Sequence, residues 1–211
     1  DCGNSSSTTA TFTIEDTTAP AIDMAAMDAL VECDGAGNDA DLDAWLASNG
    51  GAMASDACSD VTWSNDFAAL SDDCGATGMA TVTFTATDDC GNSSSTTATF
   101  TIEDTTPPAF TYVPADYTIS CEEELVYEDA TAADACGDVT VSLIEEIILD
   151  DTCPYAYTIV RAFTATDDCG NATNATQTIS VVDETAPVFM AEESIELSLS
   201  LIHISEPTRR L

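Results

Sequence analysis

Two stretches of the chain alternate strictly between apolar and polar residues. In residues 81–87 and again in residues 97–102, apolar side chains alternate mostly with threonine. Strict alternation is typical of a β-strand with one buried face. The intervening residues 89–92, Asp-Cys-Gly-Asn, favour a turn. We therefore predict a β-hairpin whose inward-facing residues are Val82, Phe84, Ala86, Ala98, Phe100 and Ile102.

A second hairpin of the same kind follows later in the chain. Its first strand carries Tyr157, Ile159, Phe163 and Ala165, and its second carries Ile179 and Val181. We interpret the two hairpins as the closing strands of two antiparallel sandwiches.

Internal repeats set the organisation of the chain. Residues 1–18 recur unchanged as residues 89–106, and a diverged copy spans residues 168–185. The spacing between copies is 88 and then 79 residues, which suits a small β-sandwich. We therefore predict an all-β chain of tandem immunoglobulin-like antiparallel sandwiches. The predicted segments are the last strand of a truncated repeat (1–18), two whole repeats (19–106 and 107–185), the start of another repeat (186–198) and a tail (199–211).

One short helix is predicted inside the first whole repeat. This repeat has 24 residues between its first two cysteines, where the second has 14. The additional residues, 38–50, begin with helix-capping side chains, end at a glycine, and place Leu42, Trp45 and Leu46 on one face. Alternating aspartates here also resemble a calcium loop, but that loop needs a glycine where Ala44 stands. We therefore predict a helix.

Charge excludes several classes of partner. The chain has 39 acidic and 3 basic residues, and its net charge is −36. Such a chain offers no basic patch for nucleic acid and is repelled by anionic membranes. Because 45% of the residues are hydrophobic and patterned, it is not a disordered acidic tail.

The cysteines indicate an oxidising compartment. The chain has nine cysteines, none in a Cys-x-x-Cys pair, so structural disulfides in an extracellular protein are expected. No apolar run approaches the roughly 20 residues that a membrane span needs.

The last residues differ from the rest of the chain. Residues 199–211 hold His203 and two of the three arginines, and they resemble a translated sequencing adapter. The alternative is a genuine short C-terminal strand. We treat the tail as an artefact and give His203 no functional weight.

The residues 84–92 and 163–171, both Phe-Thr-Ala-Thr-Asp-Asp-Cys-Gly-Asn, resemble the core signature of hyalin-type (HYR) repeats. These are immunoglobulin-like sandwiches found in tandem in extracellular proteins, and the cysteine-rich form in very large bacterial surface proteins is the most similar. The resemblance covers residues 1–198 and implies extracellular adhesion or spacing. It offers no catalytic residues.

Four cysteines in each repeat allow three pairings. In a seven-strand sandwich the turns at residues 56–60 and 88–92 both lie at the N-terminal pole, and the first strand ends at the opposite pole. This topology favours pairing within each repeat. The predicted disulfides are Cys58–Cys90, Cys33–Cys74, Cys136–Cys169 and Cys121–Cys153.

The same topology gathers acidic residues at each N-terminal pole, where calcium would bridge adjacent repeats. Calcium takes six to eight hard oxygen ligands. The alternative is that these residues stand there because turns favour them, with their charge solvated. The candidate ligands are Glu15, Asp16, Asp56, Asp60, Asp88, Asp89, Asn92, Glu103, Asp104, Asp134, Asp138, Asp167, Asp168 and Asn171.

Arg161 is the one basic residue outside the tail. It aligns with Val82, in register with inward-facing residues. Either it is buried and paired in the second sandwich, or it stands near a strand end and reaches solvent.

Catalysis has little support in this sequence. Without His203 the chain has neither histidine nor lysine, so Ser–His and Cys–His arrangements cannot be built. We predict a non-enzymatic spacer or stalk of a secreted or cell-surface bacterial repeat protein, an adhesin, whose partners are the neighbouring repeats. One alternative is that the repeats themselves bind a glycan or cell-surface ligand, but only 7% of residues are aromatic and most face inward. Another is an accessory module of an extracellular hydrolase.

Overall fold

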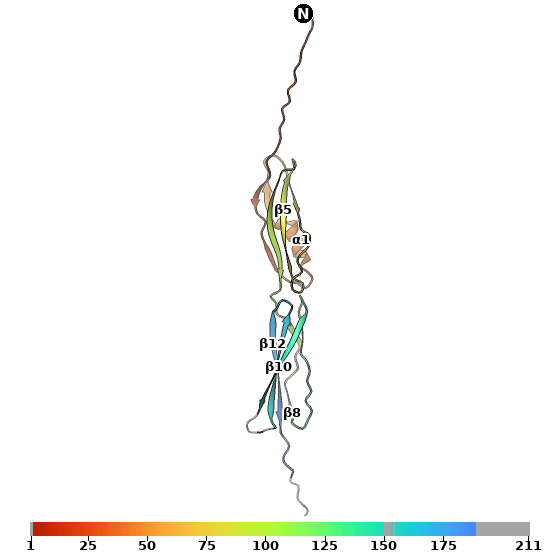
Figure 1. The fold of residues 1–211 in the computed structure, drawn as a ribbon, viewed down its shortest axis with the longest axis vertical. Helices are drawn as coiled ribbons and strands as arrows, with labels where there is room; N and C mark the ends of the chain where they lie inside the picture. The colour runs from red at the N-terminus through yellow and green to blue at the C-terminus, as the bar shows by residue number, and fades with distance from the viewer. Residues whose placement is uncertain (1, 150–152, 154, 189–211) are drawn as a thin grey trace, which may run out of the picture.

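The computed structural model describes residues 2–149, 153 and 155–188. Two β-sandwiches lie end to end along one long axis, one from each whole repeat (Figure 1). Residues 2–20 contain no helix or strand, and most of this segment extends away from the first sandwich, which it joins at the buried Pro20. Residues 189–211, with most of the predicted further repeat and the whole predicted artefact tail, lie outside the described residues.

The first sandwich has a four-stranded and a two-stranded sheet. The larger sheet has the order β2 (Ala29–Glu32), β6 (Ser93–Glu103), β5 (Gly78–Asp88), β4 (Val61–Asn65), and only the β2–β6 pair is parallel. The smaller sheet pairs β1 (Ala21–Met24) with β3 (Met53–Ser55). Helix α1 (Asp39–Ala47) and the 3-10 turn η1 (Asn49–Gly51) lie between β2 and β3 in the chain.

The second sandwich repeats this topology. Its larger sheet has the order β8 (Tyr117–Ser120), β12 (Ala172–Val182), β11 (Tyr157–Asp167), β10 (Val139–Leu149), with β8 parallel to β12. The smaller sheet pairs β7 (Ala109–Tyr112) with β9 (Thr131–Ala133). No helix is found in the described residues of this repeat. The predicted all-β class is confirmed, and the strands fall within the two predicted repeats.

The two predicted hairpins are β5–β6 and β11–β12. Their register pairs Val82 with Ala98 in the first repeat. The predicted inward residues are buried throughout, except that Tyr157 is half-buried. The linker prolines Pro20 and Pro108 are also fully buried. The apolar alternation therefore identified the core strands correctly.

Helix α1 supplies the apolar centre of the first repeat. The Trp45 ring lies 5.2 Å from the Phe84 ring and 5.5 Å from the Phe100 ring. Its indole N–H donates to the Met27 carbonyl at 3.0 Å. Gly50 has φ +64°, and a Cβ there would lie 3.2 Å from the Phe84 ring, so the chain passes close behind the aromatic cluster. The helix prediction is confirmed and the calcium-loop alternative fails.

The second repeat places Arg161 at the position of Val82, opposite Gln177. Arg161 is 2% exposed, and one guanidinium nitrogen donates to the Glu128 carbonyl at 2.7 Å and to Gln177 Oε1 at 2.9 Å. The Gln177 amide donates in turn to the Ala115 carbonyl at 2.8 Å. The buried, paired interpretation of Arg161 is therefore correct.

Candidate functional site at the junction between repeats

The linker between the repeats is held by both of them. The Asn171 side-chain amide of the second repeat donates to the Asp104 carbonyl at 2.9 Å. The Glu32 carboxylate, at the end of β2, accepts from the Thr105 N–H and the Thr106 hydroxyl, each at 2.8 Å. These hydrogen bonds, the Thr105 N–H first among them, hold the pKa of Glu32 below its usual value. The linker is therefore hydrogen-bonded to both repeats.

The turns at the N-terminal pole of each repeat are built by an Asp–Asn pair. In the second repeat the Asp167 carboxylate accepts from the Asn171 N–H at 2.8 Å and from its side-chain amide at 3.0 Å. In the first repeat Asp88 accepts from Asn92 in the same two ways, both at 2.8 Å. Both oxygens of each carboxylate are thus used in the turn. Four of the predicted calcium ligands therefore have a structural role in these turns.

Two disulfides cross the junction and connect the repeats covalently. They join Cys33 to Cys136 and Cys74 to Cys169, with Cα–Cα distances of 6.1 and 5.2 Å. The predicted disulfides Cys33–Cys74 and Cys136–Cys169 are therefore wrong. The topology argument placed each of these four cysteines at the correct pole. It missed that the C-terminal pole of one repeat abuts the N-terminal pole of the next, which offers each cysteine a partner across the junction.

The other two predicted disulfides are not formed either. Cys58 and Cys90 are exposed thiols, and Cys121 is a half-buried thiol, so the bridges Cys58–Cys90 and Cys121–Cys153 are absent. Negative charge on Asp16, together with burial and with charge on Asp56 and Cys90, raises the pKa of the Cys58 thiol. Cys58 and Cys90 thus share the N-terminal pole of the first repeat without a bond between them.

Two glycines allow the repeats to approach this closely. Gly35 has φ +75° and Gly75 has φ +55°, so both are in the left-handed region. A Cβ at either position would overlap a backbone carbonyl of the second repeat, that of Ala135 or of Cys136. The Ala76 N–H donates to the Cys136 carbonyl at 2.6 Å across the junction. Any other residue at these positions would force the repeats apart.

These glycines were missed by the sequence analysis. The available signal was their position: one follows Cys33 by two residues and the other follows Cys74 directly. At the corresponding positions of the second repeat stand Glu123 and Pro154. The difference becomes meaningful only once the cysteines are known to bond between repeats.

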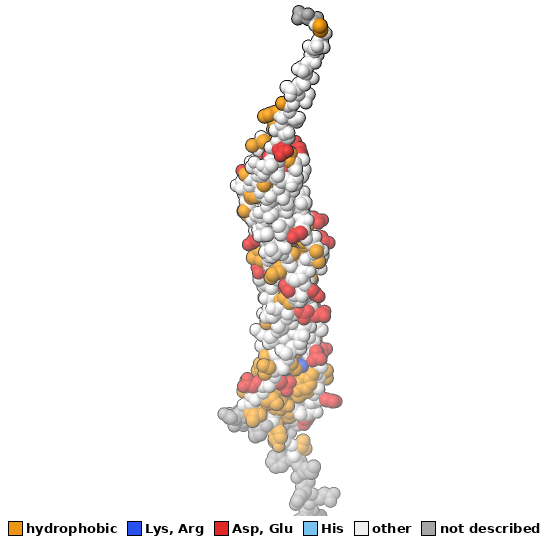
Figure 2. All heavy atoms as spheres, turned by 45° about the horizontal axis from the view of Figure 1, so that its top comes forward, with side chains coloured by type: hydrophobic (Ala, Val, Ile, Leu, Met, Phe, Trp, Pro, Cys, Tyr) orange, Lys and Arg blue, Asp and Glu red, His pale blue; other side chains and the backbone are white. Residues whose placement is uncertain are grey.

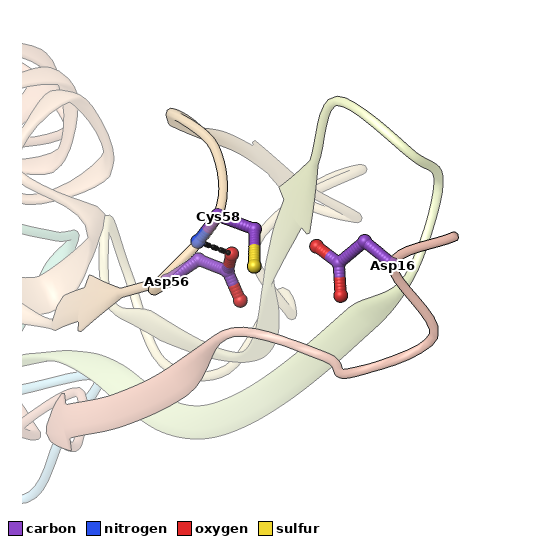
Figure 3. A group of neighbouring side chains, drawn as sticks. All are labelled: Asp16, Asp56 and Cys58. Carbon is purple, nitrogen blue, oxygen red and sulfur yellow. Dashed lines mark hydrogen bonds between the residues drawn. The ribbon is translucent and has the colours of Figure 1, made fainter. Parts of the chain in front are cut away.

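The predicted calcium ligands gather only in part. Asp16 and Asp56 offer carboxylate oxygens within 4.8 Å of each other and of Cys58 Sγ (Figure 3), and Asp104 and Asp134 do the same beside Cys136. The sulfur of Cys136 is in a disulfide and is not a thiolate ligand. One oxygen of Asp16 is buried without a hydrogen-bond partner.

Asp104 is the most buried carboxylate in these two clusters. It is 9% exposed, and burial, followed by the negative charges of Asp134 and Asp167, raises the pKa of its carboxyl. A cation at this position would relieve both effects. The other six candidates are exposed and do not converge on these pairs: Glu15, Asp60, Asp89, Glu103, Asp138 and Asp168.

Comparisons with known proteins give structural neighbours only. No protein-family model matches the chain, and no curated protein matches its sequence. It is similar to a Drosophila N-cadherin EC1–4 structure, with 12% identity, a TM-score of 0.33 and coverage of 79% of this chain and 50% of that one. It is also similar to human protocadherin-24 EC1–2, with 13% identity, a TM-score of 0.31 and coverage of 80% and 99%. The chain thus spans half the length of the N-cadherin fragment.

The strand topology itself defines the class of this chain. It consists of two immunoglobulin-like β-sandwiches in tandem, each built from a four-stranded and a two-stranded sheet. The two disulfides indicate an extracellular location. Within residues 2–149, 153 and 155–188, no helix has the length and hydropathy to cross a bilayer.

Proposed function

We propose that this chain is part of a stiff spacer in a secreted or cell-surface bacterial protein built from HYR-like repeats. The observation that carries the proposal is the pair of disulfides across the junction, Cys33–Cys136 and Cys74–Cys169. Two covalent links and the linker itself make three separated connections between the sandwiches. Three separated connections oppose bending and twisting, whereas a single linker forms a hinge.

The surface is compatible with this role. Figure 2 shows acidic side chains along the length of the rod on the face in view. A high net charge keeps such a rod soluble and opposes its collapse onto other copies. No catalytic arrangement is needed for a spacer, and the proposal assigns none.

Residual dipolar couplings test the stiffness directly. In the oxidised chain, both repeats should report one common alignment tensor. After reduction, or in the variant Cys33→Ser/Cys74→Ser, the two tensors should differ in magnitude. The matched control is Cys58→Ser/Cys90→Ser, which removes two cysteines outside the junction and should keep the common tensor. Distinct tensors in the oxidised wild-type chain would reject the spacer proposal.

We propose in addition that calcium stiffens these poles. The donor type fits, because Asp104 and Asp134 each retain a carboxylate oxygen to which no hydrogen bond is found in the described structure. Asp16 and Asp56 form the equivalent pair in the first repeat, and one Asp16 oxygen is buried and unpaired. When bound, calcium would neutralise charge on closely spaced carboxylates.

Thermal unfolding in calcium and in EDTA, at matched ionic strength, tests this second element. Calcium should raise the unfolding temperature by several degrees, and Asp104→Asn should remove most of that rise. The control Asp72→Asn changes an exposed acid outside the clusters and should leave the rise intact. An equal rise in wild type and Asp104→Asn would assign the effect to general screening.

One observation favours the alternative function, adhesion through the repeats themselves. Strand β10 is a sheet edge of 11 residues, and its side chains Leu143, Ile144, Ile147 and Ile148 are 42–71% exposed. Figure 2 shows hydrophobic side chains gathered towards the end of the rod where the second repeat lies. Exposed apolar edge strands pair readily with other chains. If β10 is adhesive, the wild-type chain should self-associate in sedimentation velocity, and Ile144→Lys/Ile148→Lys should abolish that self-association. A wild-type chain that stays monomeric at high concentration would exclude self-association through β10.

A further inference from the structure

The N-terminal pole of the first repeat has the same construction as the pole that is bonded in the second. Cys58 occupies the position of Cys136, and Cys90 occupies the position of Cys169. In the second repeat both cysteines form disulfides to the preceding sandwich. In the first repeat both are exposed thiols.

The local geometry of the two poles agrees in detail. The Cys58 N–H donates to Asp56 at 2.8 Å, and the Cys136 N–H donates to Asp134 at 2.7 Å. The turns that carry the second cysteine also match, because Gly91 and Gly170 have φ of 90° and 91°. Each cysteine of the first pole is therefore presented as its bonded counterpart is.

The incoming linker is already in place at this pole. The Asn92 side-chain amide donates to the Asp16 carbonyl at 3.2 Å, as that of Asn171 does to Asp104 at 2.9 Å. The proline that follows each linker, Pro20 or Pro108, is fully buried. A sandwich ending in residues 1–18 would therefore meet the first repeat as the first repeat meets the second.

The sequence identifies which kind of sandwich fits. Residues 1–18 are identical to residues 89–106, which close the first repeat. A partner must also carry glycine at the positions of Gly35 and Gly75, because side chains there would overlap the backbone of the facing pole. The C-terminal pole of the first repeat has these glycines. The second repeat has Glu123 and Pro154 instead and does not fit.

Ser59 is the main difference at the receiving pole, since Gly137 stands there in the second repeat. A Cβ at position 137 would lie 3.3 Å from Asp168 Oδ2 in its own repeat and 3.4 Å from Gly75 Cα across the junction. In the first repeat the Ser59 hydroxyl already accepts from the N–H of Asp89, the counterpart of Asp168. The Cβ of a serine at this position is therefore compatible with a glycine, and with nothing larger, on the facing pole.

We propose that the N-terminal pole of the first repeat is a docking surface for the C-terminal pole of another repeat of its own kind. Two disulfides close this contact: Cys58 bonds to the partner's cysteine at position 33, and Cys90 bonds to the one at position 74. This inference extends the proposed spacer function and rests on it, by making the double disulfide a recurring link along a longer rod.

The redox step is thiol–disulfide exchange with a small-molecule disulfide. A thiolate of one pole attacks the oxidant and forms a mixed disulfide, releasing one reduced thiol. The facing cysteine thiolate then displaces the second thiol and leaves the inter-repeat bond. Each new disulfide thus consumes one oxidant disulfide and releases two small-molecule thiols, which take up the two electrons and two protons that the protein thiols lose.

The test extends the full chain at its N-terminus with a second copy of residues 19–88. Because residues 1–18 match residues 89–106, this completes a preceding repeat identical to the first. After oxidation with oxidised glutathione, mass spectrometry of proteolytic peptides should find Cys58 linked to the copied Cys33 and Cys90 linked to the copied Cys74. A Cys58–Cys90 bond, or free thiols at both residues, would overturn the inference.

Two control chains sharpen the result. In the first, the copied Cys33 and Cys74 are changed to serine, and both linked peptides must disappear, which assigns them to the new junction. In the second, the copied Gly35 and Gly75 are changed to Glu and Pro, as in the second repeat. The linked peptides should then fall at least tenfold; undiminished linkage would overturn the requirement for glycine.

The same digests separate this inference from the proposed function. The native disulfides Cys33–Cys136 and Cys74–Cys169 are mapped in every sample. If they form while Cys58 and Cys90 stay unlinked to the copy, the docking inference fails and the spacer proposal stands. If they do not form either, both fail.

Discussion

The two repeats share one strand topology but differ in the residues at the centre of the core, which are apolar in the first repeat and polar in the second. In the first, the cross-strand pair Val82–Ala98 lies in an apolar core completed by Trp45 from helix α1. In the second, the same register holds Arg161 and Gln177, and no helix is found among its described residues. Backbone carbonyls of the loops that flank β8 accept hydrogen bonds from both side chains of this polar pair, while the Arg161 Nε atom is buried without a hydrogen-bond partner.

The difference shows that the central pair and its cover belong together. An apolar pair needs an apolar cover, which the 38–50 insertion supplies. A polar pair needs acceptors within reach, and the Arg161 head also lies 5.0 Å from the Tyr127 ring and 3.7 Å from carboxylates of Asp129 and Glu145. A repeat that combined one kind of pair with the other kind of cover should be unstable.

The largest effect should come from placing the polar residue under the apolar cover. Val82→Arg buries a charge within a cluster of apolar side chains, none of which carries a carboxylate. We expect a loss of about 5 kcal/mol in the free energy of unfolding of the first repeat, measured by urea denaturation with tryptophan fluorescence, since both tryptophans lie in this repeat. Thr81→Arg, on the exposed face of the same strand, is the matched control and should change stability by less than about 0.5 kcal/mol. A small effect of Val82→Arg would break the comparison.

Removing the apolar cover should have the next largest effect. Trp45→Ala leaves a cavity against Phe84 and Phe100 and should cost about 4 kcal/mol. Circular dichroism during urea denaturation measures this loss, and the transition of the second repeat should not move. Tyr155→Ala removes an aromatic side chain that is 69% exposed and serves as the control. Equal losses in the two variants would show that Trp45 does not stabilise the core.

The polar network of Arg161 and Gln177 in the second repeat can also be disrupted by mutation. Arg161→Ala leaves the Gln177 carbonyl oxygen without its guanidinium donor and should cost about 3 kcal/mol in the second repeat. Because the two side chains form one network, Arg161→Ala and Gln177→Ala should couple by at least about 1 kcal/mol in a double-mutant cycle. Strictly additive losses would contradict the network.

The smallest effects concern two carboxyl groups at the linker, Asp104 and Glu32, whose pKa values are shifted in opposite directions. The raised pKa of Asp104 means that its ionised form lowers stability at pH 7 and that this cost disappears as the pH falls through that pKa. In EDTA, Asp104→Asn should therefore raise the unfolding temperature by a few degrees at pH 7, with no difference at about pH 3.

Glu32 provides the opposite case at the same linker. Its lowered pKa contributes stability above the ordinary value of 4.5, and that contribution is lost as the pH falls through the folded pKa. Glu32→Gln should therefore slightly lower the unfolding temperature at pH 7 and have no effect in strong acid. Thermal melts of both variants from neutral to acid pH measure these changes in unfolding temperature. If Asp104→Asn and Glu32→Gln changed it in the same direction at pH 7, the opposite pKa shifts would be refuted.

Much of the fold could be predicted from the sequence because its signals are local. Alternation in residues 81–87 and 97–102 identified the buried faces of β5 and β6, and the spacing of Leu42, Trp45 and Leu46 identified α1. The Asp–Asn turns were predicted as turns, since those side chains bond to backbone groups two to four residues away.

What the sequence by itself determined about this protein was therefore the four strands of the two hairpins, the helix, the repeats and the poles at which Cys33, Cys74, Cys136 and Cys169 lie. The tertiary structure alone decided which cysteines bond, because two at one pole face two at the next and the choice depends on how closely the repeats approach at Gly35 and Gly75. It also decided that Arg161 is buried, since its acceptors come from residues 33 and 16 positions away in the chain. Contacts between distant segments depend on packing geometry, and no local pattern records that geometry.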